Sequence, residues 1–173
     1  MRYLFFSCCL MFVSFANAQQ THEVKTTSGH FTPSPNQGFF TEMAWQEIPS
    51  FEGSKYVLVQ FYTLPSELSK QQMKEHGIEL INYLPVNCYH AKVKDNFIAN
   101  RFEGFSIRSV HYLSPIQKIH ERIKLGNAPL HAQDGNLYKL MLSLQKGVLA
   151  NTILHYLQSH GAKILNVYNQ QHI

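Results

Sequence analysis

The chain is short of charge, of basic clusters and of cysteine. Only 15% of its 173 residues are charged, and 15 Lys and Arg against 11 Asp and Glu give a formal net charge of +4. No run of Lys and Arg is longer than a pair, whereas nucleic-acid-binding domains usually carry a basic stripe. With 45% hydrophobic and 13% aromatic residues, the chain is also unlike a disordered one, which is poor in aromatic residues and rich in net charge. Its length suits one domain of ordinary size or two small ones.

A hydrophobic run long enough to span a membrane is also lacking, but the first 18 residues have the three regions of a secretory signal peptide. Arg2 provides the positive region, residues 4–15 are apolar apart from two serines, and Ala16-Asn17-Ala18 is an A-x-A cleavage site. The apolar region is shorter than the roughly 20 residues of a membrane helix. We therefore expect cleavage after Ala18 and a secreted or periplasmic protein without membrane contact after cleavage.

Removal of this signal leaves a single cysteine. Cys8 and Cys9 lie within the signal, so only Cys88 remains. Small secreted domains often rely on disulfides, but one cysteine cannot form an internal bridge. Its neighbours Tyr89 and Ala91 are typical of a strand, which favours a buried apolar thiol over a reactive one. The mature chain is expected to fold on its hydrophobic core alone.

Residues 54–113 show alternating strand and helix patterns. The preceding residues 19–53 are polar and rich in turn residues without a visible period, and are expected to form a flexible leader. The order from residue 55 on is strand, helix, strand, strand, helix, strand, at 55–61, 66–76, 78–84, 88–93, 95–103 and 105–113. This order predicts an α+β fold, a ferredoxin-like βαββαβ sandwich with an antiparallel sheet and both helices on one face.

A second, incomplete βαβ unit is expected at residues 137–173, after a linker at 114–136. Strand-like runs at 137–144 and 162–168 flank a helical stripe. The stretch His76–Asn82 resembles His160–Asn166, which indicates a duplication. The last two strands and the second helix of the unit are missing, so we expect the chain to be the front of a longer protein.

Ten histidines invite a metal or catalytic interpretation, but their spacing opposes it. His155 and His160 are five apart and diverge around a helix, and one cysteine does not complete a zinc set. The pairs His76-Gly77 and His160-Gly161 are interpreted as helix ends, because glycine favours the left-handed cap. Neither a Ser/His/Asp set nor a Gly-x-Ser-x-Gly motif indicates hydrolysis. We predict no catalytic residue, metal or cofactor; pH sensing by histidine stays open beside solvated histidines without a role.

Residues 55–113 resemble the propeptide of secreted bacterial subtilisin-like serine peptidases. The motifs that carry the likeness are Lys55–Phe61, His76–Pro85, Val86–Val93 and Ser106–Val110. In that family the propeptide is an intramolecular chaperone and inhibitor. The open face of its sheet packs on the peptidase, and the segment after the fourth strand lies in the cleft like a product. The resemblance implies a partner-binding sheet formed by Tyr56, Val57, Val59, Phe61, Tyr89, Ala91, Ile107 and Val110. It implies an inhibitory tail formed by Tyr112, Leu113, Ser114, Pro115, Ile116, Gln117 and Lys118.

The leading hypothesis is therefore the N-terminal propeptide region of a secreted subtilisin-like protease, which chaperones and inhibits a peptidase domain that this chain lacks. The expected partner is that peptidase domain, in cis or in trans. No nucleic-acid partner is expected. Two alternatives stay open: a stand-alone secreted inhibitor acting in trans, and a periplasmic or extracellular protein-binding module. Whether a full-length parent is an enzyme also stays open.

Overall fold

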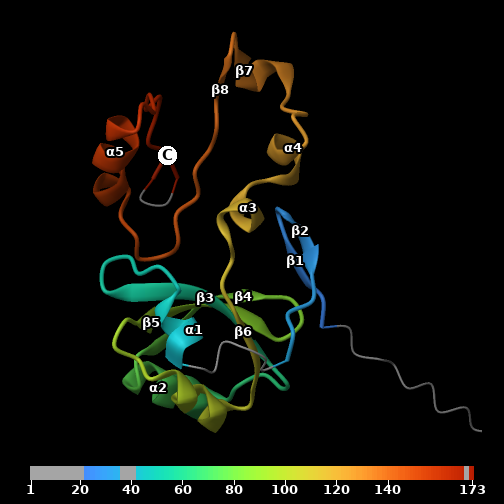
Figure 1. Ribbon diagram of the computed structural model, residues 1–173, viewed down its shortest axis with the longest axis vertical. Helices are drawn as coiled ribbons and strands as arrows, with labels where there is room; N and C mark the ends of the chain where they lie inside the picture. Colours follow the sequence, from blue (N-terminus) through green and yellow to red (C-terminus); the bar gives the residue numbers. More distant parts are fainter. Residues whose placement is uncertain (1–21, 36–41, 170–171) are drawn as a thin grey trace, which may run out of the picture.

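The structure is a computed structural model that describes residues 22–35, 42–169 and 172–173 (Figure 1). The expected signal peptide, residues 1–18, lies outside these ranges. The centre is a four-stranded sheet of β3 (Ser54–Phe61), β4 (Ile78–Leu84), β5 (Cys88–Lys94) and β6 (Ile107–His111). The strands lie in the order β4-β5-β3-β6, and every neighbouring pair is antiparallel. The predicted α+β class with an antiparallel sheet is therefore confirmed.

The first strand–helix–strand segment forms where the sequence predicts it. β3 is rich in β-branched and aromatic residues, which favour strands. α2 (Glu67–Glu75) begins after Ser66, whose Oγ accepts a hydrogen bond from the backbone N–H of Ser69 at 3.1 Å. The helix ends at His76, and Gly77 follows with a φ of 91°, a left-handed conformation that glycine adopts without steric cost. The chain then enters β4.

The second connection is a 3-10 helix where the sequence predicted an α-helix. This element, η1 (Ala99–Phe105), follows Ile98 without a side-chain capping bond. The expected helix spanned residues 95–103, so the observed element begins later, and Gly104 falls inside it. Glycine weakens an α-helix interior, and seven residues is long for a 3-10 helix. Phe102 still packs into the core from this element.

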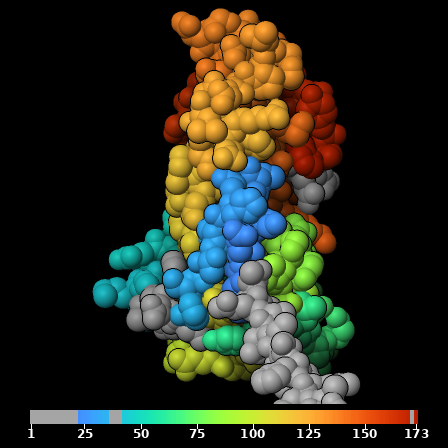
Figure 2. Space-filling model, turned by 90° about the vertical axis from the view of Figure 1, so that its right-hand side faces the viewer, coloured from blue at the N-terminus to red at the C-terminus, as the bar shows by residue number. Residues whose placement is uncertain are grey.

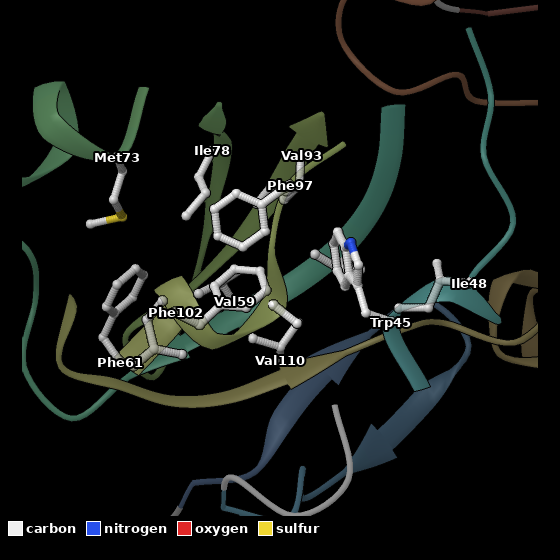
Figure 3. Close-up of a cluster of buried hydrophobic side chains, with 14 residues drawn as sticks. Trp45, Ile48, Val59, Phe61, Met73, Ile78, Val93, Phe97, Phe102 and Val110 are labelled. Carbon is white, nitrogen blue, oxygen red and sulfur yellow. The ribbon is translucent and has the colours of Figure 1, made fainter. Parts of the chain in front are cut away.

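One face of the sheet carries the main hydrophobic core. α2, η1 and the short helix α1 (Glu42–Gln46) cover this face (Figure 1). Trp45 of α1 meets Phe97 and Phe102 edge-on, with ring centroids 5.9 and 5.5 Å away (Figure 3), an arrangement that stabilises beyond the burial of area. The buried cluster consists of Trp45, Ile48, Val57, Val59, Phe61, Met73, Ile78, Ala91, Val93, Phe97, Ala99, Phe102, Ile107 and Val110.

The region expected to be a flexible leader carries defined elements instead. β1 (Val24–Thr26) and β2 (Gly29–Phe31) form an antiparallel hairpin, and α1 sends Trp45 into the core. The buried amino group of Lys55 donates to the carbonyls of Trp45 at 2.8 Å and Ile48 at 2.9 Å, which ties the end of α1 to β3. Elements of three to five residues are too short to show a period. Pattern reasoning therefore missed them.

The chain after β6 forms short elements that extend away from the sheet (Figure 1). They are α3 (Pro115–Lys118), α4 (Glu121–Lys124), η2 (Leu130–Ala132), β7 (Gln133–Asp134), β8 (Leu137–Tyr138) and α5 (Ala150–Ser159). The helix expected before Gly161 is present as α5. The strands expected at 137–144 and 162–168 differ from prediction: β8 spans two residues, and residues 162–168 form no strand. A strand needs a paired neighbour for its backbone, and β8 pairs with the two residues of β7.

Candidate protein-binding surface

Most of the sheet residues expected to contact a partner lie in the protein's own core. Six of the eight are at most 4% exposed, between the sheet and the helices that cover it: Val57, Val59, Phe61, Ala91, Ile107 and Val110. Tyr89 is half-buried and packs against the same cluster, with its ring centroid 6.0 Å from that of Phe61. Side chains alternate between the two faces of a strand, and these face the helices. They leave no accessible surface for a partner, so this part of the prediction is corrected.

The opposite face of the sheet, here called the hairpin face, is partly covered by β1 and β2. Val24 of the hairpin is fully buried and forms a second cluster with Leu58 of β3 and Cys88 of β5. Phe31 packs against this cluster. Figure 2 shows the hairpin running from the sheet toward the segments after β6, and the Lys124 amino group donates to the carbonyl of Ser28 at 2.7 Å. The face that the resemblance leaves open for a peptidase is thus partly occupied by this chain.

A buried polar pair fixes the N-terminal segment on the hairpin face. Nη1 of Arg108 donates to Oε1 of Gln60 at 2.7 Å and to the carbonyl of Pro33 at 2.8 Å. Nε2 of Gln60 donates to the carbonyls of His22 and Val86, each at 3.1 Å. A buried polar group left unpaired costs about 1–3 kcal/mol, so these bonds specify where the segment lies. Sequence reasoning missed the pair, although two polar residues inside apolar strands were a signal of such a contact.

Tyr56, the one predicted sheet residue on the hairpin face, is half-buried there. Its hydroxyl is withdrawn from solvent and has no hydrogen-bond partner among the described residues. Burial raises the pKa of this phenol, and the carboxylates of Glu52 and Glu79 raise it further. Toward β4 the face is accessible, because Glu79 and Asn82 are exposed while Lys92 is half-buried. This strip is the open part of the hairpin face.

Two histidines flank Leu58 on the hairpin face. Leu58 of β3 pairs with His90 of β5 and with His111 of β6. His111 has its ring centroid 4.7 Å from that of Phe31 and its Nε2 3.4 Å from Oε1 of Gln117. Nδ1 of His90 lies 3.4 Å from Nε2 of Gln145. Burial lowers the pKa of both imidazoles, which favours their neutral form. A different segment of the chain lies against each histidine: Phe31 and Gln117 against His111, and Gln145 against His90.

Cys88 is a buried thiol, as the sequence predicted. It lies between the sheet and the hairpin, in the cluster with Val24 and Leu58. Burial raises the pKa of its thiol to about 12. The thiolate is the nucleophilic form, so the folded protein holds this sulfur in an unreactive state.

The expected inhibitory tail, residues 112–118, begins half-buried and then turns into α3. Oε1 of Gln117 accepts hydrogen bonds from the backbone N–H of Ser114 at 3.0 Å and from its hydroxyl at 3.1 Å, and the Lys118 amino group lies 4.8 Å from the ring centroid of Tyr112. Pro115, Ile116 and Lys118 are exposed; Tyr112, Leu113, Ser114 and Gln117 are half-buried. A product-like segment is extended, so the turn at 115–118 must unwind before it fits a peptidase cleft.

The histidine–glycine pairs end helices, as the sequence predicted. Nδ1 of His76 lies 2.8 Å from the carbonyl oxygen of Gln72, and Nδ1 of His160 lies 2.9 Å from that of Tyr156.

Across the described ranges, no three His, Cys, Asp or Glu side chains come together as metal ligands would. In the same part of the chain, no helix has the length and apolar character needed to cross a membrane.

Large hydrophobic side chains gather on the surface of residues 116–168. Those more than half exposed are Ile116, Leu125, Leu130, Leu137, Tyr138, Leu140, Met141, Leu149, Tyr156, Leu165 and Tyr168. Where exposed apolar side chains form one contiguous patch, they are typical of sites that bind another polypeptide. In the sequence, many of these residues belong to the strand-like runs at 137–144 and 162–168. Only the structure shows that most residues of these runs do not pair as strands.

The fold and surfaces define a small α+β domain with a covered sheet, followed by an extension rich in exposed apolar residues. The chain belongs to a family defined by a domain of unknown function (DUF8729), whose model matches residues 25–114. The matched region includes the hairpin, α1 and the whole four-stranded sheet. Residues 25–53 therefore belong to the same domain as the sheet. Neither the curated proteins nor the solved structures contain a significant match to the chain.

Proposed function

We propose that this chain is a protein-binding module that inhibits a subtilisin-like serine peptidase and assists its folding. The observation that carries the proposal is the connectivity of the sheet. The segments β3-α2-β4 and β5-η1-β6 interleave to give the order β4-β5-β3-β6 with antiparallel neighbours. This interleaving supports a ferredoxin-like sandwich with η1 in place of its second helix. The motifs at residues 55–61 and 76–93 add the likeness to peptidase propeptides.

The proposed contact surface is the accessible part of the hairpin face together with the tail. It has three parts. The first is the strip on β4 with Glu79 and Asn82, and the second is the outer side of the hairpin, where Lys25 and His30 are exposed. The third is the tail, residues 112–118. Phe31 of the hairpin contacts His111, which precedes the tail, and Lys124, which follows the tail, donates to the carbonyl of Ser28. These two contacts hold the hairpin near the segment that contains the tail. One partner surface can therefore reach both.

We further propose that the protein is secreted and that its peptidase partner lies either in the same polypeptide or in a separate one. The signal-like residues 1–18 support secretion. Expression with the native N-terminus in a bacterial host tests it, because mass spectrometry of the exported protein should show Gln19 as the first residue. Retention of Met1 or of the apolar region would contradict the proposal.

Titration of purified subtilisin with residues 19–173 tests the inhibitory function. We expect slow, tight inhibition, and faster recovery of activity when denatured peptidase refolds in the presence of the module. Ile116→Asp, within the tail, should weaken inhibition at least tenfold, a difference of about 1.4 kcal/mol. The matched variant Leu130→Asp places the same charge at an exposed position outside the tail and should leave inhibition unchanged. Equal inhibition by both variants would place the contact elsewhere, and absence of inhibition by the folded chain would remove the proposal's support.

A further inference from the structure

The strand β4 is an edge of the four-stranded sheet. It lies at one end of the order β4-β5-β3-β6, and within the described ranges it pairs with β5 alone. An edge strand presents a row of backbone N–H and C=O groups that can pair with another strand. β4 is seven residues long and contains neither proline nor lysine, two residues that commonly protect an edge. Its outer side is therefore suited to strand pairing.

The hydrogen bonds of β5 show which backbone groups of β4 point outward. The N–H of Phe61 donates to the carbonyl of Asn87 at 2.9 Å, so the backbone of residue 87 faces β3. The N–H of Lys94 donates to the carbonyl of Gly77 at 2.9 Å, so the backbone of residue 94 faces β4. Since these groups alternate in direction along a strand, three residues of β5 direct theirs to β3: Tyr89, Ala91 and Val93.

The residues of β4 opposite these three direct their backbone away from β5. They are Ile78 opposite Val93, Leu80 opposite Ala91, and Tyr83 opposite Tyr89. The pairing shifts between Leu80 and Asn82, so Ile81 is an additional residue at this point. Because the partners on β5 are alternate residues, the outward groups keep the spacing of a regular strand despite this bulge.

The three outward units are symmetric about Leu80. If two copies of the chain pair antiparallel along β4, Leu80 faces Leu80 of the second copy. Ile78 then faces Tyr83 of the second copy, and Tyr83 faces its Ile78. Each outward unit both donates and accepts in such a ladder. A twofold contact of this kind uses the same surface of both copies and closes on itself.

The helix α2 lies along this edge with its middle beside Leu80. A groove between α2 and β4 is lined by Lys70 and Gln71 of the helix and by Leu80 of the strand. The Lys70 amino group lies 5.7 Å from the ring centroid of Tyr89, which pairs with Tyr83. The start of α2 is therefore at the Tyr83 end of β4. A twofold axis at Leu80 also passes the middle of α2.

The charges of α2 have the same symmetry. Glu67 lies in the first turn and Lys74 in the last, about 10 Å apart along the helix axis, which is too far for an ion pair within one chain. Lys74 has no ion pair in the described part of the chain. Glu67 is 88% exposed and accepts from Lys70 at 2.7 Å, and a carboxylate has a second oxygen for another donor. Around the axis, each Glu67 comes to the Lys74 of the other copy.

We propose that two copies of this chain associate through β4, antiparallel about a twofold axis at Leu80. The two four-stranded sheets then continue into each other, and the two α2 helices lie side by side with reciprocal pairs of Glu67 and Lys74. The contact also covers Leu68, which lines the groove and is 66% exposed. It uses the edge and the helix side of β4, whereas the surface proposed for the peptidase comprises the hairpin face and the tail. The inference therefore goes beyond the proposed function and does not depend on it.

A charge exchange on α2 tests the contact by sedimentation equilibrium of residues 19–173. We expect a reversible dimer, whose dissociation constant rises at least tenfold in Glu67→Lys and in Lys74→Glu, because each dimer contains the pair twice. The double variant should return to within threefold of the original constant, and only a contact between copies explains this recovery. Glu121→Lys also replaces an exposed acidic residue in the first turn of a helix and should change the constant less than twofold. A double variant as weak as the single ones would overturn the proposal.

Hydrogen exchange followed by two-dimensional NMR tests the strand pairing itself. The outward amides of Leu80 and Tyr83 should exchange at least tenfold more slowly when the protein concentration is raised above the dissociation constant. The amide of Glu79 faces β5 and should not depend on concentration. A monomer at about 1 mM, a dissociation constant of about −4 kcal/mol in binding free energy, would overturn the proposal. So would a dimer that leaves both outward amides unprotected, and so would protection independent of concentration, since a segment of the same chain would then cover the edge.

Discussion

Replacement of Trp45 by alanine tests whether the region before β3 is a structural part of the domain. Trp45 is 1% exposed and packs edge-on against Phe97 and Phe102, and the Lys55 amino group lies 5.4 Å from the centre of its ring. Truncation of a buried Trp to Ala typically costs about 3–5 kcal/mol. Here it also removes two edge-on ring pairs of about 0.5–1.5 kcal/mol each, which places the loss toward the upper end. Native domains are stable by about 5–15 kcal/mol, so Trp45→Ala should remove a large share of the total.

Urea unfolding followed by far-UV circular dichroism measures this loss without depending on tryptophan fluorescence. Met43 gives the control, because it lies on the same short helix with 76% of its surface exposed. Met43→Ala should change the free energy of unfolding by less than about 0.5 kcal/mol. If Trp45→Ala were as stable as Met43→Ala, α1 would not be docked on the sheet, and the loose leader expected from the sequence would be the better description.

Two further predictions follow from groups buried on the hairpin face. Burial lowers the pKa of His90 and His111 below the ordinary value of about 6.5, so below that pH the unfolded chain binds more protons than the folded one. This contribution to stability should be full above about pH 6.5 and fall as the pH drops. The double variant His90→Gln, His111→Gln should therefore flatten the pH dependence of the urea unfolding midpoint between about pH 5.5 and 7.5. An unchanged pH dependence would contradict the burial of the two imidazoles. Burial raises the pKa of Cys88 to about 12, so residues 19–173 should react with a thiol reagent at pH 8 at least about a hundredfold more slowly when folded than in urea, and equal rates would place the thiol at the surface.

Long patterns with capping residues made part of the fold predictable from sequence. β4 occupies the residues expected of it, and α2 begins after Ser66 and ends before Gly77 because a hydroxyl cap and a left-handed glycine mark its ends. The short elements β1, β2 and α1 gave no such signal. Their positions depend on distant contacts, such as the bond from Arg108 to the carbonyl of Pro33, which no local window contains.

The side of the sheet that faces a partner was harder to predict than the sheet itself. Alternation along β3 shows that Val57, Val59 and Phe61 share one face. It does not show whether helices of the same chain or a foreign surface cover that face. Trp45 and Phe102 both pack on these residues. The sequence predicted that the segment of Phe102 would cover one face, but it did not reveal the docking of α1, which carries Trp45. The contact residues implied by the resemblance became core residues for this reason.

The two units show the same limit from the other direction. Residues 55–61 and 139–144 both carry strand-forming sequences, yet only the first form a full strand, because β5 and β6 pair with them on both sides. The helix ends of the two units agree in detail, since a helix satisfies its backbone within its own segment. A strand satisfies its backbone only through a neighbour. Local sequence therefore predicts the helix α5 better than the strands expected on either side of it, because those strands depend on pairing with other segments.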